Sequence, residues 1–350
     1  MEKSLAIIIS PNYKDYAKKY LLECIESIRA QDYAGEIKIF LTDNETSMES
    51  VEFIRKIAPE LELILNNTND GFAKGNNDCM REALRQGYEY IVLFNMDTVV
   101  DQSCVSEMVS AIEFDDKIGV VQARVMLYDN KEKVNSLGNI SHFLGFGYSI
   151  AYRDEYRERS DLSRIHYPSG VAIIFKREVL ECIGLFDETY WMYNEDQEIG
   201  WRAWLAGYRV VLAPKAVIYH KYEFAKSIKQ FYYMDRNRIL AILQCYKVAT
   251  LILIFPVFVI MEIGLILFSL KSGWFKEKMR VWAYFFSIGN WQYIIRARKR
   301  NQNLRRVSDR KIAKLMSGKI WYQEVDDWKL RFINPFFNFY WKMCQKVMFW

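Results

Sequence analysis

The sequence is poor in the residues that build metal clusters and disulfide frameworks. It contains three histidines and six cysteines in 350 residues, and no two cysteines form a CxxC pair. Such scattered cysteines exclude a zinc finger and a disulfide-rich scaffold, and they indicate reduced thiols in the cytosol. A signal peptide is not expected, because the first apolar run covers only residues 5–9 and is typical of a buried strand.

The chain has no large excess of one sign of charge, but its charged residues are unevenly distributed. The net charge is +5, and 51% of the residues are hydrophobic, which excludes global disorder. Residues 271–350 hold 18 Lys and Arg against 5 Asp and Glu, a net charge of +13, whereas residues 1–270 carry −8. This basic, aromatic-rich segment predicts contact with an anionic membrane surface. No nucleic acid partner is expected, since neither zinc-finger spacing nor an RNA-binding motif is present.

The first third of the chain alternates short apolar runs with amphipathic stretches. The apolar runs are bounded by polar residues and predict strands, whereas the stretches between them have apolar residues at helical spacing. This alternation predicts a parallel sheet covered by helices. The predicted strands are 5–9, 37–42, 61–65 and 90–94, and the predicted helices are 20–30, 48–57 and 73–86.

Beyond residue 119 the pattern becomes mixed. It predicts strands at 120–127, 171–175, 209–212 and 216–219, and helices at 177–183 and 195–206. We therefore expect an α/β catalytic domain over residues 1–240. Its nucleotide-binding half ends near residue 118, and its acceptor half covers 119–240. A helical, basic and aromatic-rich region follows over residues 241–350.

An almost unbroken apolar run occupies residues 251–270, interrupted by Pro256 and Glu262. About 20 residues can just span a bilayer, but a single span would place the basic segment across the membrane from the rest of the chain. Glu262 at the centre of a span would also cost about 2.5–3.5 kcal/mol. We expect a shallow hairpin with residues 281–295, or helices lying in the interface. A buried helical hairpin of a soluble domain is the alternative.

Polar residues follow three of the predicted strands. They are Ser10 to Asn12, Asp43 with Asn44, and Asn95 to Asp97. Because ligands of such sheets bind beyond the carboxyl ends of the strands, these side chains are expected to converge. A carboxylate there suits the divalent cation that a diphosphate leaving group requires. The alternative for Asp97 is a loop residue that caps the next helix.

Two further segments contain candidate binding or catalytic residues. Residues 69–77 combine two glycines, which let a backbone approach a ligand, with Lys74, which offers positive charge to a phosphate. In residues 187–196 three aromatic residues precede Glu195 and Asp196 at a predicted helix start, where the helix dipole favours ionised carboxylates. An ionised carboxylate beside sugar-stacking aromatics suits an inverting transfer, because a base must take the proton of the attacking hydroxyl.

His220 follows a predicted strand. A histidine that stands alone in the sequence is more often structural than a metal ligand.

These motifs, in this order, resemble those of glycosyltransferase family 2, which transfers sugars from nucleoside diphosphates. The resemblance implies the GT-A fold, a Rossmann-like mixed sheet flanked by helices. Within the family the chain is similar to the rhamnosyltransferase-like and galactofuranosyltransferase-like enzymes. The resemblance runs from residue 5 to about 224, through 11–13, 43–44, 69–77, 95–97 and 186–202.

The resemblance implies roles for the matching positions. Asp43 would read the pyrimidine, Asp97 and His220 would bind Mg²⁺ or Mn²⁺, and Asp196 would be the general base. Asn95 departs from the family, since it replaces the first aspartate of the usual Asp-x-Asp motif. The implied donor-binding residues are Pro11, Asn12, Tyr13, Asp43, Asn69, Gly71, Phe72, Lys74, Asn76 and Asn95, and the implied acceptor-binding residues are Trp191, Tyr193 and Glu195.

The expected function is inverting transfer of a sugar, with dTDP-rhamnose as the first choice of donor. The acceptor would be lipid-linked or a polysaccharide, at the cytoplasmic face of the cell membrane, with the protein peripheral or monotopic. A UDP-hexose or UDP-galactofuranose donor is the alternative within the same fold. An inactive nucleotide-sugar-binding or membrane scaffold is the alternative of another class. The aromatic residues 336–350 fit either an interfacial helix or a contact in a homo-oligomer.

Overall fold

The computed structural model describes residues 3–222, 228–321 and 328–350. The chain divides into two compact units. The sheet unit comprises Met1–Asn139, Ser149–Ala203 and Tyr208–Glu223, and the helical unit comprises Ile140–Tyr148, Trp204–Gly207 and Phe224–Trp350. The boundary expected at residue 240 therefore falls inside α7 (Ile228–Cys245), which belongs to the helical unit.

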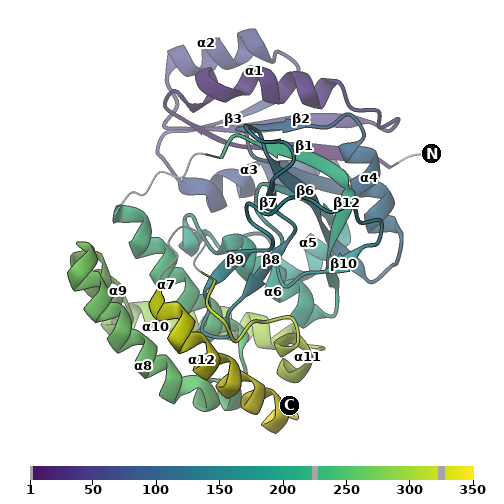
Figure 1. Ribbon diagram of the computed structural model, residues 1–350. Helices are drawn as coiled ribbons and strands as arrows, with labels where there is room; N and C mark the ends of the chain where they lie inside the picture. The colour runs from purple at the N-terminus through teal and green to yellow at the C-terminus, as the bar shows by residue number, and fades with distance from the viewer. Residues whose placement is uncertain (1–2, 223–227, 322–327) are drawn as a thin grey trace. The chain divides into compact units, whose positions relative to one another are not determined.

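The sheet unit is built on one mixed sheet of ten strands, in the order β10-β12-β6-β11-β4-β1-β2-β3, with β5 on β12 and β7 on β6 (Figure 1). Strands β1 to β4 are parallel, β11 is antiparallel to both β4 and β6, and β12 is parallel to β6. The predicted α/β class with a mixed sheet is confirmed. The strands are β1 Leu5–Tyr13, β2 Ile37–Asn44, β3 Glu62–Asn66, β4 Tyr90–Phe94, β5 Thr98–Val100, β6 Ile118–Leu127, β7 Val134–Ser136, β10 Ser163–Arg164, β11 Ala172–Lys176 and β12 Arg209–His220.

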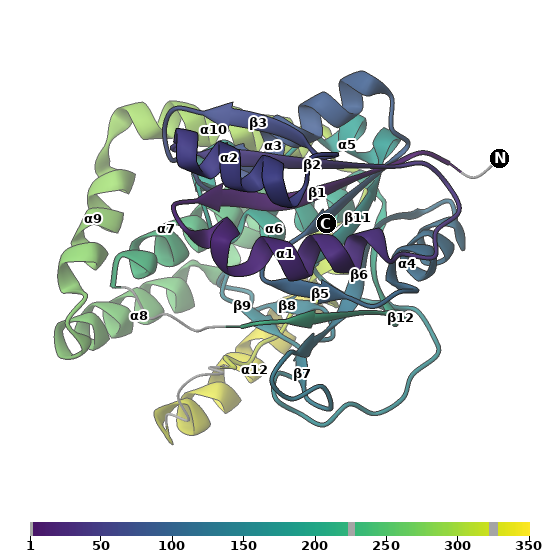
Figure 2. The same ribbon diagram turned by 90° about the horizontal axis from the view of Figure 1, so that it is seen from above.

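Helices cover both faces of this sheet, because its central strands are apolar on both sides. Residues 5–9 of β1 are fully buried. Their odd-numbered side chains pack in one core with apolar residues of α1 and α4, which lie on the same face (Figure 2). Helix α3 packs against β1 and β2 from the other face. The helices are α1 Tyr16–Arg29, α2 Met48–Ile57, α3 Gly71–Gln86, α4 Cys104–Glu113, α5 Arg177–Ile183 and α6 Glu195–Ala206.

Strand β12 differs from the prediction. The sequence predicts two short strands around Pro214, whereas the structure has one strand from Arg209 to His220. Its register to β6 shifts between Ala213 and Val217. Proline has no N–H to donate to a ladder, so the strand accommodates Pro214 in an irregularity and continues. Because the strand continues past Pro214, His220 is its last residue and lies at the end of the sheet.

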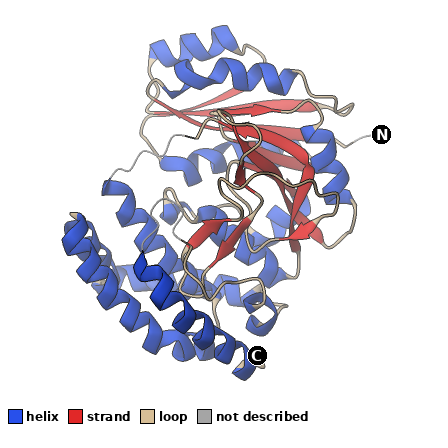
Figure 3. Cartoon of the chain, in the orientation of Figure 1, coloured by secondary structure: helices blue, strands red, loops and turns tan. Residues whose placement is uncertain are grey.

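The helical unit consists mainly of helices (Figure 3). Helix α8 is the one described helix long and apolar enough to cross a membrane, by length and composition. The segment 281–295, predicted as its hairpin partner, is divided between two helices that meet at Ser287. The elements are the pair β8 Asn139–Ser141 and β9 Gly147–Ser149, and the helices α7, α8 Val248–Ser272, α9 Phe275–Phe286, α10 Ile288–Asn303, α11 Asp309–Ala313 and α12 Trp328–Val347.

Helix α6 is held in the sheet unit by a fully buried ion pair. Arg202 Nε donates to both carboxylate oxygens of Glu198 at 2.8 Å, and neither side chain is exposed. The same guanidinium donates to the carbonyl oxygens of Gly184 at 3.2 Å and Leu185 at 2.7 Å. Arg202 thus ties α6 to the loop that follows α5.

We expect Arg202→Ala to lower the free energy of unfolding by about 3–5 kcal/mol, because it leaves Glu198 as an unpaired buried charge. Urea unfolding of the full chain measures this. Arg209→Ala is the matched control, since its ion pair with Asp115 is about one-third exposed and is worth about 0–1 kcal/mol. Equal losses in the two variants would contradict the structural role of Arg202.

Candidate active site

The carboxyl ends of β1, β2 and β4 and the last residue of β12 bring the predicted polar residues to one edge of the sheet. Asn12 lies beside Asp43 in the β1–β2 ladder, and Thr98, next to Asp97, pairs with His220 in the β5–β12 ladder. The predicted convergence of these strand ends is therefore present. It follows from the parallel order of the strands, since their carboxyl ends share one edge.

Asp97 and His220 face each other. Oδ1 of Asp97 lies 3.3 Å from Nε2 of His220, and Nδ1 of the same ring lies 3.0 Å from Oδ1 of Asn135 on β7. The ring therefore contacts a carboxylate oxygen through one nitrogen and an amide oxygen through the other. Asn135, which sequence reasoning missed, fixes the orientation of the ring.

The environment of Asp97 suits a cation ligand. Burial alone would raise the pKa of this carboxyl, but contacts with His220 and Tyr16 outweigh burial and hold the pKa below its ordinary value. Oδ1 of Asp97 and Oδ1 of Asn95 are buried without a hydrogen-bond partner in the part of the chain that the structure describes. In that same part no group of three or more His, Cys, Asp or Glu side chains is arranged to hold a metal ion.

Asp43 is held in a fixed orientation at the end of β2. Asn12 Nδ2 donates to Oδ1 of Asp43 at 2.6 Å, and Ser50 Oγ donates to Oδ2 at 2.6 Å. Oδ1 of Asn12 accepts from the backbone N–H of Ala17 at 2.8 Å. Asn12 therefore positions both Asp43 and the start of α1. Each oxygen of Asp43 retains one lone pair for a further donor.

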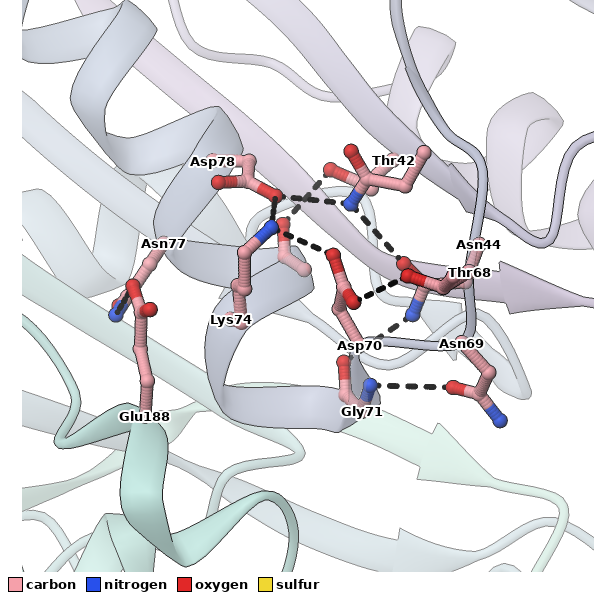
Figure 4. Close-up of polar contacts among 12 residues, drawn as sticks. Thr42, Asn44, Thr68, Asn69, Asp70, Gly71, Lys74, Asn77, Asp78 and Glu188 are labelled. Atoms are coloured by element: carbon pink, nitrogen blue, oxygen red, sulfur yellow. Dashed lines mark hydrogen bonds and ion pairs between the residues drawn. The ribbon is translucent and has the colours of Figure 1, made fainter.

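The segment 69–77 comprises the last residues of the turn after β3 and the first two turns of α3 (Figure 4). Oδ1 of Asn69 accepts from the N–H of Gly71 at 3.1 Å, and Asn44 Nδ2 donates to the Gly71 carbonyl at 3.2 Å. Lys74 differs from the sequence interpretation: its Nζ lies 2.6 Å from Asp70 Oδ2 and 3.2 Å from Asp78 Oδ2. Two carboxylates of its own helix region thus neutralise the cation that was predicted to face a phosphate.

The two glycines of this segment serve packing within the chain. Gly71 has φ +79°, and a Cβ there would lie 2.6 Å from Trp191. A Cβ on Gly75 would lie 2.4 Å from Pro11. The backbone N–H of Ala73 also donates to the Trp191 carbonyl at 3.0 Å. The predicted acceptor residue Trp191 and the predicted donor residue Pro11 therefore both pack on this turn.

The segment that leads into α6 has a strained backbone. Trp191, Tyr193 and Asn194 have φ of +61°, +67° and +64°. A non-glycine residue in this region costs on the order of 1–3 kcal/mol, and such residues gather at functional sites. Asn77 secures the start of the segment, since its amide exchanges hydrogen bonds of 3.0 and 2.9 Å with the backbone of Phe186 and donates to Glu188 at 3.0 Å.

Glu195 and Asp196 have different environments. Asp196 is half-buried; its Oδ2 accepts from the N–H of Gly170 at 3.1 Å and its Oδ1 from the N–H of Gln197 at 2.7 Å. Burial raises its pKa to about 6, against the lowering effect of these backbone donors. Oε2 of Glu195 is buried without a partner among the described residues. Burial and the neighbouring Asp196 charge raise the Glu195 pKa well above its ordinary value.

Environment therefore separates the two carboxyl groups, although the sequence interpretation treated both as ionised. The pKa of Asp196, about 6, lies below neutral pH, whereas burial and the Asp196 charge raise that of Glu195 well above its ordinary value. Gly170 also connects Asp196 to the 69–77 turn: a Cβ at Gly170 would lie 3.4 Å from the Phe72 ring and 3.8 Å from Oδ2 of Asp196. The carboxylate and the Phe72 ring thus border the same small space.

The remaining predicted residues have the following surroundings. Tyr13 is 37% exposed at the end of β1, with the Lys14 ammonium 5.1 Å from its ring centre. Asn76 donates to the Phe72 carbonyl at 2.8 Å, and its buried Oδ1 has no partner among the described residues. Burial raises the pKa of Tyr193 to about 12. Ser50 and Asn135 are the supporting residues without a sequence signal.

A comparison with known families agrees with this geometry. The model of "Glycosyl transferase family 2" matches residues 7–184, about half of the chain. The chain belongs to glycosyltransferase family 2. The match covers the strand ends with Asp43 and Asp97 and the whole 69–77 turn, and it ends before Asp196 and His220.

The curated relatives of this family member include poly-β-1,6-N-acetyl-D-glucosamine synthases. The protein of Staphylococcus aureus is 25% identical over 196 residues, which cover 56% of this chain and 45% of the relative. The protein of Staphylococcus epidermidis is 24% identical over 224 residues, which cover 61% and 52%. The chain thus spans about half the length of these relatives.

Solved structures of glycosyltransferases share the fold. S. aureus TarS 1–349 in complex with UDP has a TM-score of 0.51 at 16% identity, over 98% of this chain and 88% of TarS. GalNAc-T7 with UDP, GalNAc and Mn²⁺ has a TM-score of 0.52 at 13% identity, over 67% of this chain and 47% of that protein. At these identities the likeness establishes the GT-A fold.

We expect Gly71→Ala to lower the free energy of unfolding by about 1–2 kcal/mol or more, because alanine is strained at positive φ and its Cβ would meet Trp191. Thermal denaturation measures the loss. Gly264→Ala is the control, since a Cβ there has no atom within 4 Å and alanine favours a helix. A wild-type melting temperature for Gly71→Ala would contradict the packing assigned to this turn.

Proposed function

We propose that the protein is an inverting, metal-dependent glycosyltransferase that moves a hexosyl group from a nucleoside diphosphate to an acceptor hydroxyl. The observation that carries the proposal is the Asp196 carboxylate, which two backbone N–H groups orient beside the Phe72 ring. Its pKa of about 6 keeps it ionised at neutral pH and still basic enough to accept a proton. Family membership supports the same reaction class.

The reaction is a single displacement. Asp196 takes the proton of the acceptor hydroxyl as its oxygen forms a bond to the anomeric carbon. The bond from that carbon to the diphosphate oxygen breaks, and its electron pair leaves with the nucleoside diphosphate. Attack from the face opposite the leaving group inverts the anomeric configuration.

Asp97 and His220 are the proposed protein ligands of Mg²⁺ or Mn²⁺. Oδ1 of Asp97 and Nε2 of His220 lie 3.3 Å apart, close enough for both to bind one cation. A bound cation supplies charge neutralisation for the departing diphosphate. Asn135 holds the His220 ring. Asn95, two residues from Asp97, has a buried Oδ1 without a partner among the described residues.

The relatives favour a UDP-linked donor over the dTDP-rhamnose expected from the sequence. The curated ones synthesise a polymer of N-acetylglucosamine, and a TarS structure contains UDP-GlcNAc. We therefore propose UDP-hexoses, with UDP-GlcNAc first, and retain dTDP-rhamnose as the alternative. The proposed acceptor is a cell-surface glycan or its lipid-linked precursor. We also propose that the helical unit associates with the cytoplasmic face of the membrane.

We expect Asp196→Asn to lower kcat by on the order of 10²-fold or more, because the amide cannot accept the hydroxyl proton. Donor binding, followed by thermal shift with UDP-GlcNAc, should stay at the wild-type level. Glu195→Gln is the matched variant: it makes the same acid-to-amide change at the neighbouring position, and its loss of kcat should be far smaller. Equal losses would contradict the separate roles of the two residues.

The wild-type pH profile tests the same assignment. A base must be deprotonated, so kcat/KM should fall below the Asp196 pKa of about 6 and level off above it. A profile that rises as the pH decreases through 6 would exclude Asp196 as the base.

A donor panel tests the class and the donor together. We expect turnover of one UDP- or dTDP-sugar with Mn²⁺ or Mg²⁺, loss of turnover with EDTA, and weak metal activation in Asp97→Asn and His220→Gln. The measurement is release of nucleoside diphosphate by purified protein. If no donor binds or turns over, the inactive scaffold becomes the leading interpretation.

A further inference from the structure

Helix α8 has two opposite faces. One face carries only apolar side chains and is open, with Ile252, Ile263 and Leu267 exposed by 68%, 55% and 63%. The other face is buried in the helical unit through Thr250, Ile254, Val257, Met261, Glu262 and Ser269. The exposed residues of the open face recur at every third or fourth position along the helix, and they include Val248, Ile252, Phe255, Val259, Ile263, Leu267 and Leu270.

Helix α12 packs beside α8 and also has exposed apolar residues. It is joined to α8 by hydrogen bonds from Tyr340 Oη to the Leu253 carbonyl at 2.6 Å and from Trp350 Nε1, just beyond its end, to Thr250 Oγ1 at 2.8 Å. We call the exposed apolar residues of the two helices the apolar face. On α12 it consists of Phe332, Phe336, Phe339, Met343 and Val347, again at helical spacing.

On the buried side, α8 is tied to its neighbours by an ionic cluster of four residues. Lys278 Nζ on α9 lies 2.7 Å from Asp235 Oδ2 on α7 and 2.6 Å from Glu262 Oε2 on α8. Arg238 on α7 lies 2.6 Å from Asp235 Oδ1 and also pairs with Glu262. The four side chains are at most 7% exposed, and their charges balance.

We propose that the apolar face docks on an anionic lipid bilayer, with α8 lying in the plane of the headgroups instead of crossing the hydrocarbon core. Glu262 is in the middle of α8, so a crossing would carry the whole ionic cluster to the bilayer centre. In-plane docking leaves the cluster on the protein side and places only apolar side chains in lipid. The inference deepens the proposed membrane association and rests on it, but not on the catalytic assignment.

The positive charge near the apolar face favours an anionic lipid surface over a second copy of the chain as the binding partner of this face. Lys271 and Lys276 are exposed at the turn from α8 to α9, and Lys342 and Lys346 are exposed on α12 beside the apolar residues. Residues 271–350 carry +13 overall. Two such surfaces repel each other, whereas anionic headgroups attract them and the lysine stems reach from the apolar layer to the headgroups.

Liposome flotation of the full chain tests the docking face. We expect it to float with phosphatidylcholine vesicles that contain phosphatidylglycerol, and the double variant Ile263→Glu/Leu267→Glu to lose binding on the order of tenfold or more. Phe114→Glu is the matched control, because Phe114 is 79% exposed in the sheet unit and should not affect flotation. Wild-type flotation of the double variant would overturn the proposal.

Two controls separate this result from other causes. The double variant should retain the wild-type melting temperature and UDP-sugar turnover, since its substituted side chains are exposed. Loss of flotation with intact turnover therefore reports on docking, and absent turnover in both proteins reports on the proposed reaction. Sedimentation velocity without lipid should give one monomeric species. A dimer that the double variant abolishes would assign the apolar face to a second copy and overturn the proposal.

Cysteine labelling tests the orientation of α8. Ala249→Cys and Ser272→Cys, one at each end of α8, are each made in a Cys182→Ser background because Cys182 is the exposed native thiol among the described residues. In sealed vesicles with the cytoplasmic side outward, both cysteines should react with a membrane-impermeant maleimide. If either one reacts only after detergent is added, the helix end is across or within the bilayer and the proposal fails.

Discussion

The arrangement of the site depends on the burial of the central strand β1. Its residues 5–9 are covered on both faces, so the strand can only lie inside a sheet whose neighbours pair all of its backbone groups. Pairing it in parallel with β2 and β4 brings their carboxyl ends to one edge. Asn12, Asp43 and Asp97 are placed there as a consequence. The polar residues at the strand ends lie close together because the apolar strands that precede them must be buried side by side.

Environment, rather than residue type, determines what the carboxyl groups at this edge can do. Contacts with His220 and Tyr16 hold the pKa of Asp97 below its ordinary value in spite of burial, which suits a cation ligand. Asp196 is half-buried beside backbone donors, and its pKa of about 6 suits a base. Glu195, one residue away, has a buried Oε2 without a partner among the described residues, and its pKa is raised well above its ordinary value. Three similar side chains therefore have three different proton affinities in one site.

In the helical unit, a buried acidic residue is neutralised by basic residues of neighbouring helices. Glu262 interrupts an apolar run, which the sequence interpretation weighed only as a cost of insertion. In the structure it is balanced by Arg238 and Lys278 from the helices on either side. Breaking one member would leave a buried charge unpaired, so the cluster holds three helices in one relative arrangement. The apolar residues on the opposite side of α8 then remain exposed.

The sequence by itself determined the alternation of elements, the strand ends and the family, because these follow from local periodicity and from ordered motifs. Strand 90–94 and helices 48–57, 177–183 and 195–206 have the predicted bounds. Only the tertiary structure decided the surroundings of single residues. The glycines at 71 and 75 make room for Trp191 and Pro11, and Lys74 is neutralised by Asp70 and Asp78. Asn135 and Ser50 had no signal at all, because a supporting hydrogen bond joins residues distant in the chain and leaves no periodic trace.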